Sequence, residues 1–521
     1  MKFNPVLLEV FKNKFSSIAE EMGMTLIRTS FSPNIKERKD CSCALFDGEG
    51  NMVEQAAHIP VHLGSMPLSV RAAIESCKME KGDMVILNDP YRGGTHLPDI
   101  TLVAPVFFQS HEPIFYVANR AHHSDVGGMS PGSMPLSTSI FQEGIIIPPL
   151  KLVEKGEIDR KIMDFFLSNV RIRDEREGDF EAQIMANITG MKRLEEVFNK
   201  YGKELVVYYA KELLNYSERL TRSMISEIPD GRYVFCDYLD DDGIDDRPIK
   251  IGVVVTVKGS SLEIDFTDSS AQVSGSVNAV YAITLSCVLY VIRSLIDVDV
   301  SANAGCMRPV RVITKPASVV DARYPAAVAA GNVETSQRIV DVLLGAFSRA
   351  LPEKIPAASQ GTMNNISIGG IDHKTGRHFS YYETIGGGMG AAPGRHGADA
   401  VHSHMTNTMN TPVEALEYTY PFLVTEYKIR KNSGGRGQFK GGNGIIRRIK
   451  FLDDAQVTVL SERRKFPPYP LAGGHPGKKG KNIVVKEGKE MEMPGKFRRK
   501  FDKGEEIIIK TPGGGGWGRD K

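Results

Sequence analysis

Cysteines and long apolar runs are both scarce in this sequence. Six cysteines among 521 residues are too few for a disulfide framework. No run approaches the roughly 20 apolar residues that a membrane-spanning helix needs, and residues 1–5 lack the apolar core of a signal peptide. We therefore expect a cytoplasmic protein that does not interact with membranes and does not depend on disulfides.

The chain has no excess of positive charge, since 65 Lys and Arg residues stand against 63 Asp and Glu residues, a net charge of +2. Binding to nucleic acid requires clustered Lys and Arg side chains that neutralise phosphates. The one basic cluster, at residues 496–500, is interpreted as a solvent-exposed hairpin or loop. We therefore expect no nucleic-acid partner.

Neither of two common phosphate-binding loops is present. The pair Gly477-Lys478 lacks both the upstream glycine and the following hydroxyl residue of a P-loop. Gly93-Gly94-Thr95 is similar to the phosphate loop of actin-like ATPases, but the flanking acidic residues stand at the wrong positions. The glycine runs at 386–390 and 513–516 are interpreted as tight turns and close backbone approaches. We therefore do not expect this chain alone to bind ATP.

Helical and strand-like patterns alternate too irregularly for a doubly wound parallel sheet, so the sequence predicts a multidomain α+β fold. Helices are expected at residues 5–29, 66–78, 160–225, 279–296 and 336–350. Strands are expected at residues 41–46, 84–87, 101–108, 114–119 and within 232–266. The N-terminal half should combine helices with mixed sheets, and the glycine-rich and lysine-rich C-terminal region should be β-rich. The predicted domains span residues 1–228, 229–430 and 431–521.

The segment 88–128 carries the densest group of residues suited to chemistry. His96, Asp99, His122, His123 and Asp125 all lie near glycine-rich turns at the ends of predicted strands, where loops present functional groups on a rigid scaffold. Imidazole and carboxylate ligands together suit a divalent metal such as Mn²⁺, Zn²⁺ or Fe²⁺. Adjacent side chains in a strand face opposite ways, so only one of the two neighbouring histidines should point into the site.

A structural role is the competing interpretation of these residues, because a lone histidine is usually a hydrogen-bonded core residue. Three histidines and two aspartates between positions 96 and 125 favour a functional site instead. His58 and His62 form a second candidate pair, but Pro60 between them argues against a helical zinc site.

Motifs along most of the chain identify a family. The sequence resembles the hydantoinase B family, which includes the C-terminal part of 5-oxoprolinase, the B subunit of N-methylhydantoinase and a large subunit of acetone carboxylase. The motifs that carry the resemblance are NIKERKD (34–40), NDPYRGGTHLPD (88–99), AHHSDVGG (121–128), GDFEAQ (178–183), AGNVETS (330–336), ETIGGGMGA (383–391), SGGRG (433–437) and TPGGGGWG (511–518).

The resemblance implies a division of labour within a hetero-oligomer. An A-type, hydantoinase A-like ATPase subunit would use ATP to phosphorylate the carbonyl oxygen of a small cyclic amide. This chain, as the B-type subunit, would then complete the hydrolytic opening of the ring. By similarity to the metal-bearing carboxylase relatives, the ligands of a divalent metal would be Glu37, His96, Asp99 and either His122 or His123.

Three supporting roles fit such a reaction. A bound metal would activate water or polarise the carbonyl group. Asp125 or Asp40 could orient a histidine ligand or act as general base. The backbone N–H groups at Gly93 and Gly94, or at Gly127 and Gly128, could hold the oxyanion.

Two other functions compete with hydrolysis. The first is a subunit of an ATP-dependent ketone carboxylase similar to acetone carboxylase, which would use the same His/Asp cluster. The second is a non-catalytic scaffold that only completes the site of the partner. Carboxylase large subunits in the family tend to be longer than this chain, which favours the hydrolase.

Overall fold

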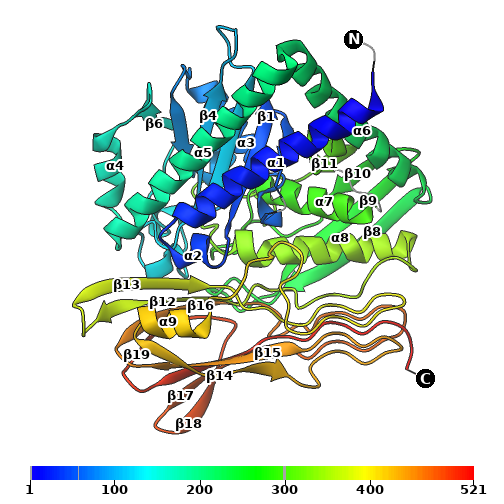
Figure 1. Ribbon diagram of the computed structural model, residues 1–521. Helices are drawn as coiled ribbons and strands as arrows, with labels where there is room; N and C mark the ends of the chain where they lie inside the picture. The colour runs from blue at the N-terminus through cyan, green and yellow to red at the C-terminus, as the bar shows by residue number, and fades with distance from the viewer. Residues whose placement is uncertain (1–2, 57, 297–300, 521) are drawn as a thin grey trace.

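The computed structural model describes residues 3–56, 58–296 and 301–520. Two parts are stacked on each other in Figure 1. The upper part contains the long helices and the N-terminal sheet, and the lower part is built almost entirely of strands. This arrangement confirms the predicted α+β class, with the β-rich region at the C-terminal end.

A seven-stranded antiparallel sheet forms the centre of the upper part. Its order is β2 (Met52–Gln55), β1 (Cys41–Asp47), β5 (Phe115–His122), β4 (Asp99–Val106), β3 (Met84–Leu87), β6 (Leu150–Glu154) and β7 (Glu157–Ile158). The strands β1, β4 and β5 are buried along nearly their whole length, because helices cover the sheet. Its end, where β4 begins and β5 ends, holds the candidate site.

Long helices cover one face of this sheet (Figure 1). They are α1 (Pro5–Thr29), α5 (Arg173–Tyr201) and α6 (Lys203–Ser226). Asn4 caps α1 by accepting a hydrogen bond from the Val6 N–H, and Pro5 occupies the first turn. Phe11 and Phe15 lie on the buried stripe of α1, as the helical spacing predicts. Shorter helices of this half are α2 (Pro33–Lys36), α3 (Met66–Ser76) and α4 (Arg160–Leu167).

A second sheet packs against α7 (Tyr281–Leu295) and α8 (Ser336–Ala350) within the same hydrophobic core. Its order is β11 (Val310–Ile313), β10 (Ser261–Asp265), β9 (Ile249–Lys258) and β8 (Gly231–Leu239). A buried π-helical turn, Gly331–Thr335, leads directly into α8. Such turns often occur at functional sites, and this one reaches the candidate site.

The lower part consists of two sheets and the short helix α9 (Val413–Thr419). One sheet has the order β13 (Arg377–Glu383), β12 (Asn365–Asp372), β16 (Ala455–Leu460) and β19 (Lys496–Phe501). The other has the order β14 (Phe422–Arg430), β15 (Gly444–Phe451), β20 (Glu506–Lys510), β17 (Lys481–Lys486) and β18 (Lys489–Met493). The apolar side chains of the two sheets form a core of their own, from Ile366 to Ile509.

The basic cluster at 496–500 corrects one prediction. It forms strand β19, which pairs with the distant strand β16 rather than forming a hairpin or loop; Arg498 and Lys500 are exposed as expected, but Lys496 is 4% exposed. Its ammonium group forms ion pairs with Glu462 and Asp241. The three predicted domains remain a prediction, and the packing itself changes from one core to the other near residue 360.

A bundle of glycine-rich segments completes the lower part, near the C-terminus in Figure 1. Four consecutive N–H groups, from Gly513 to Gly516, donate in turn to the carbonyl oxygens of Lys478, Gly442, Ala358 and His475. The first and fourth donors thus meet the same neighbouring segment, as in an extended helix of three residues per turn. A Cβ atom on Gly514 would lie 2.0 Å from the Met389 carbonyl oxygen, so side chains are excluded from the middle of the bundle.

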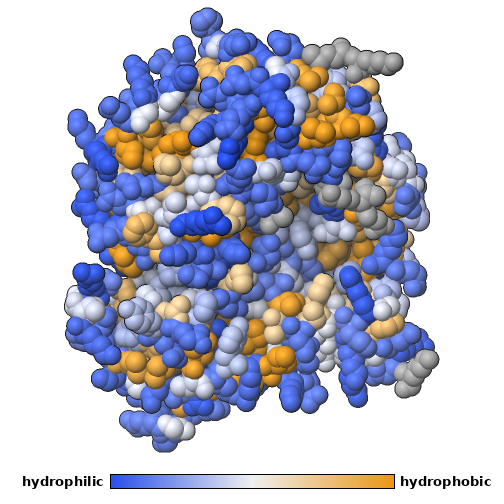
Figure 2. Space-filling model, in the orientation of Figure 1, coloured by the Kyte–Doolittle hydropathy of each residue, from blue (hydrophilic) through white to orange (hydrophobic). Residues whose placement is uncertain are grey.

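The face of the molecule shown in Figure 2 is largely polar, with separate apolar patches between the charged residues. Every helix in the described ranges is too short or too polar to cross a lipid bilayer.

Candidate metal centre

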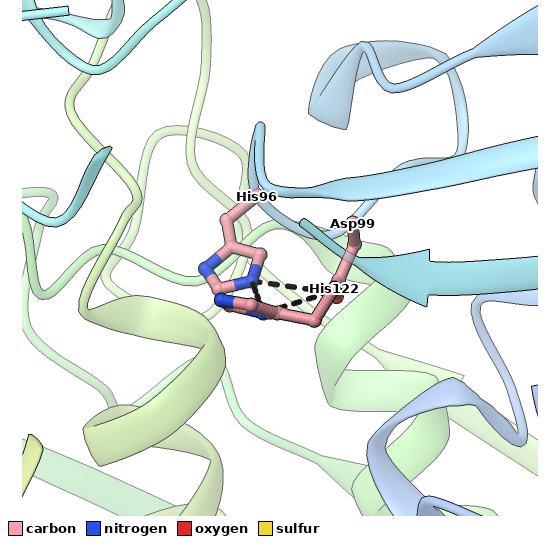
Figure 3. A group of neighbouring side chains, drawn as sticks. All are labelled: His96, Asp99 and His122. Carbon is pink, nitrogen blue, oxygen red and sulfur yellow. Dashed lines mark hydrogen bonds and ion pairs between the residues drawn. The ribbon is translucent and has the colours of Figure 1, made fainter. Parts of the chain in front are cut away.

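Three side chains meet at the end of the seven-stranded sheet. Asp99 begins β4 and lies opposite His122, which ends β5, while His96 lies in the loop before β4. The three point toward one another (Figure 3). The Nε2 atom of His96 lies 3.2 Å from Nδ1 of His122 and 3.3 Å from Oδ1 of Asp99, and His122 Nδ1 lies 3.2 Å from that oxygen. All three residues are at most 2% exposed.

The two carboxylate oxygens of Asp99 have different partners. Oδ1 faces the two histidines, whereas Oδ2 accepts a hydrogen bond of 2.5 Å from the Thr95 hydroxyl. Nε2 of His62 lies 3.3 Å from Oδ2, and Nδ2 of Asn332 lies 3.4 Å from it. Because Oδ2 is held by three groups, the carboxylate cannot rotate freely, and Oδ1 is fixed toward His96 and His122.

A hydrogen bond to the backbone orients His96. Its Nδ1 lies 3.1 Å from the carbonyl oxygen of Ala329, which can only accept, so Nδ1 carries a proton. In the neutral form of the imidazole, the amide of Asn332 can donate to Nε2 at 3.0 Å. The Ala329 loop is itself fixed, because the carboxylate of Glu143 accepts hydrogen bonds from the N–H groups of Val328 and Ala329.

The charges of the site support one another. Burial alone would raise the pKa of Asp99, but the nearby imidazoles of His96 and His62, together with hydrogen bonds from His122 and His62, hold it well below its usual value. Burial lowers the pKa of His96, yet the neighbouring Asp99 carboxylate outweighs burial and raises it overall. Asp99 is therefore an ionised carboxylate enclosed by imidazoles.

The geometry of these three residues fits a divalent metal. At metal–ligand distances of about 2.0–2.2 Å, neighbouring ligand atoms in tetrahedral to octahedral sites lie roughly 2.9–3.5 Å apart. The three separations of 3.2, 3.2 and 3.3 Å fall in this range. In the described parts of the chain, His96, Asp99 and His122 form the group whose possible ligand atoms all lie within 4.8 Å of one another. Two imidazoles and one carboxylate suit Zn²⁺, Mn²⁺ or Fe²⁺.

The two adjacent histidines face opposite sides of β5, as alternation in a strand requires. His122 turns toward Asp99, and its ring stacks on Tyr382 with ring centroids 4.7 Å apart. His123 turns toward α5 instead, where its Nε2 lies 3.0 Å from Oε1 of Gln183 and its ring packs on Phe180. Burial lowers the pKa of His123 to about 4. The structure thus separates the two histidines that the sequence left undecided.

Two acidic residues of the NIKERKD motif lie at different places. Asp40 is 7% exposed, its carbonyl oxygen accepts the backbone N–H of His122 at 3.0 Å, and its carboxylate charge helps to raise the pKa of His96. It therefore lies beside the cluster. Glu37 follows α2, is partly exposed, and does not belong to the group of three ligands.

Asp125 organises a loop in this structure. Its carboxylate accepts hydrogen bonds from the N–H groups of Gly127 and Gly132 and forms an ion pair with Arg171 at 2.9 Å. Two of the four proposed oxyanion donors already have acceptors. The Gly94 N–H donates to the Asp89 carbonyl oxygen, and the Gly127 N–H donates to Asp125. An oxyanion role for the N–H groups of Gly93–Gly94 or Gly127–Gly128 stays a prediction.

Three residues of the site were not assigned a role from the sequence: His62, Asn332 and Tyr382. Pro60 begins a 3-10 turn that ends at His62, so the proline that argued against a helical site in fact positions this histidine beside Asp99. Asn332 lies in the AGNVETS motif, which marked the segment without indicating its target. Tyr382 comes from the lower part of the molecule, and no local pattern connects it to His122.

Comparisons with known proteins identify the family of the chain. Residues 4–520 match the family described as hydantoinase B/oxoprolinase. The 5-oxoprolinase of Dictyostelium discoideum is 40% identical, over 99% of this chain and 40% of that protein. A protein of Pseudomonas sp. (strain NS671), named as the B subunit of a D-/L-hydantoinase, is 31% identical, over 99% of this chain and 90% of its own length. The chain thus spans less than half of the oxoprolinase and most of the hydantoinase subunit.

Two solved structures share the fold. The ATP-dependent caprolactamase from Pseudomonas jessenii superimposes with a TM-score of 0.93 at 28% identity, over 100% of this chain and 92% of that chain. Acetone carboxylase superimposes with a TM-score of 0.92 over 99% of this chain and 76% of that chain, and its 17% identity shows a common fold alone. The chain belongs to the hydantoinase B/oxoprolinase family.

Proposed function

We propose that the chain is the B-type subunit of an ATP-dependent cyclic-amide hydrolase, and that His96, Asp99 and His122 bind one divalent metal at its active site. The observation that carries this proposal is the convergence of three buried ligand atoms at 3.2–3.3 Å. The type of reaction is inferred from the relatives, which are named 5-oxoprolinase, hydantoinase and caprolactamase.

The name of one relative supports a partner subunit. Nearly the whole chain matches 40% of the 5-oxoprolinase, so these 521 residues correspond to one part of that enzyme. The hydantoinase relative is named a subunit and is matched over 90% of its length. An A-type ATPase subunit would activate the amide by phosphorylating the carbonyl oxygen. An unstrained lactam needs this activation because it is a poor electrophile.

Two groups of residues would have different roles in the ring opening: one binds the metal and the other orients a ligand. His96, Asp99 and His122 would hold the metal, which would lower the pKa of bound water or polarise the activated carbonyl group. His62, Thr95 and Asn332 hold the second oxygen of Asp99 and so fix the direction of the first.

Asp40 is the carboxylate best placed to take up a proton, because it is buried directly beside the histidines. Glu37 would need its partly exposed side chain to turn inward before it could become a further ligand. Asp125 would act indirectly, by holding the loop that follows His122 through its ion pair with Arg171.

Elemental analysis combined with turnover by the reconstituted pair of A-type and B-type subunits tests the proposal. Wild-type protein should contain about one metal per chain and open cyclic amides only with ATP and the partner. His96→Ala should lose the metal and several orders of magnitude of turnover. His123→Gln is the matched control, since this neighbouring buried histidine faces α5, and it should keep the metal. A wild type that is active without metal would contradict the proposed role of the three residues.

A ketone carboxylase would use the same three residues but would form a carboxylated ketone instead of an opened cyclic amide. The 5-oxoprolinase and the hydantoinase subunit are both more than 30% identical to this chain, which favours hydrolysis. ATP-dependent fixation of bicarbonate into a ketone by the reconstituted pair, without opening of any cyclic amide, would establish the carboxylase instead.

A further inference from the structure

Three buried residues, Tyr382, Asn365 and Glu334, form a series of contacts that begins at His122. The ring of Tyr382 on β13 stacks on His122 with an interplanar angle of 16°. The Tyr382 hydroxyl donates to Oδ1 of Asn365 on β12 at 2.7 Å. The Asn365 amide in turn donates to Oε1 of Glu334 at 2.7 Å. These contacts lead from one proposed metal ligand to the π-helical turn Gly331–Thr335.

The contacts form a closed ring, because the same turn carries Asn332. The Nδ2 atom of that side chain lies 3.0 Å from Nε2 of His96 and 3.4 Å from Oδ2 of Asp99. One side of the ring thus fixes His122 through Tyr382, and the other side fixes His96 and Asp99 through Asn332. Both sides start from the backbone of residues 332–334, which are at most 4% exposed.

Further hydrogen bonds hold the residues of this closed series of contacts in place. The Asn365 amide also donates to the Leu460 carbonyl oxygen, and the Met363 N–H donates to Glu334. Arg38 donates to the Tyr382 carbonyl oxygen, and its guanidinium lies 5.2 Å from the centre of the tyrosine ring. The side chain of Tyr382 is therefore restrained at its ring, its hydroxyl and its backbone.

We infer that Tyr382, Asn365 and Glu334 are positioning residues that set the orientation of the His122 imidazole relative to His96 and Asp99. This inference rests on the proposed metal site. None of the three residues is placed to bind the metal itself, so each acts through a ligand. Groups that orient metal-binding histidines typically change metal affinity by roughly 10- to 100-fold when they are removed.

Two neighbouring tyrosines on β13 provide a matched test. Tyr382→Phe keeps the stacked ring and removes only the hydroxyl link to Asn365. Tyr381→Phe removes the hydroxyl of an equally buried tyrosine, whose ring lies on the opposite face of the strand against Tyr420 and Phe422. Titration of the metal-free chains with Co²⁺ should give a dissociation constant roughly tenfold higher for Tyr382→Phe and unchanged for Tyr381→Phe.

A second pair of variants tests Glu334, where the contacts from Tyr382 reach the π-helical turn. Burial raises the pKa of Glu334 to about 8, so this side chain is mainly neutral at pH 7. Glu334→Gln keeps a neutral acceptor for Asn365 and should bind Co²⁺ like the wild type. Glu334→Ala removes the acceptor and should weaken binding at least as much as Tyr382→Phe. Wild-type affinity in Glu334→Gln together with weaker binding in Glu334→Ala would show that the hydrogen bond to Asn365, and not a charge on residue 334, is what matters.

The visible absorption of bound Co²⁺ distinguishes positioning from general stability. Tyr382→Phe should shift the ligand-field bands, which report the geometry around the bound ion and which a general loss of stability alone does not move. Unchanged affinity and bands in Tyr382→Phe would overturn the positioning role and leave the metal site intact. A wild type that binds no Co²⁺ would overturn the metal site and, with it, this inference.

Discussion

Replacing Glu143 by glutamine should change how the stability of the protein depends on pH. Burial raises the pKa of this carboxyl from 4.5 to about 7, so the folded state binds the proton more tightly than the unfolded state. Its stabilising contribution is complete below about pH 4.5 and is lost as the pH rises through about 7. At about 1.4 kcal/mol per pKa unit, the loss amounts to about 3 kcal/mol.

Glu143→Gln preserves the structure around this position. Its amide oxygen can still accept the N–H groups of Val328 and Ala329, which orient the loop next to His96. Its NH₂ group takes the place of Oε2, which has no hydrogen-bond partner among the described residues. Because glutamine is neutral at every pH, the variant should gain stability relative to the wild type as the pH rises, by about 2–3 kcal/mol between pH 5 and pH 8.

Urea unfolding of both proteins at pH 5, 6, 7 and 8 measures this difference. Titrating groups that do not interact with Glu143 affect both proteins equally and cancel in the comparison. A difference in unfolding free energy that stays constant from pH 5 to pH 8 would refute the reasoning, because Glu143 would then titrate alike in the folded and unfolded states.

Three further predictions follow from the site and the glycine bundle. His122→Ala should abolish metal binding, whereas His123→Ala should keep the metal and lose about 1–3 kcal/mol of unfolding free energy; metal content and urea unfolding measure the two effects. Gly514→Ala should cost about 3 kcal/mol or more, because its Cβ would meet a backbone oxygen at 2.0 Å, whereas Gly231→Ala, which first meets the Tyr233 hydroxyl at 3.1 Å, should cost less than about 1 kcal/mol. The isolated chain should show no micromolar binding of Mg-ATP by calorimetry, and such binding would contradict an ATPase function confined to the partner.

Periodicity was sufficient to predict most regular elements. The helices α1 and α8 begin and end where the apolar spacing and the flanking residues indicated. The strands at the site were predicted with displaced bounds, since β4 begins at Asp99, two residues before the predicted start, and β5 continues to His122, three residues beyond the predicted end. Polar residues at these strand ends suggested loops, but their backbone groups pair across the sheet and their side chains converge on one another.

The local part of the site could be predicted because His96, Asp99 and His122 lie within one short segment. Its distant part could not, because Asn332 and Tyr382 reach the cluster only through tertiary packing of the π-helical turn and of β13. The oxyanion donors were placed from glycine content alone, which does not reveal that the Gly94 and Gly127 N–H groups already have acceptors. Close backbone approach at residues 513–516 was expected from the glycines, and the structure confirms it.

The glycine bundle has a consequence for the order in which the protein folds. The N–H groups of residues 513–516 bind three segments, which include Ala358, Gly442 and the stretch from His475 to Lys478. These partners are 35 to 157 positions away in the chain, and contacts of such long sequence separation form slowly. The three segments lack their shared partner until residues 513–516 have been synthesised, so this region cannot complete its fold before that point.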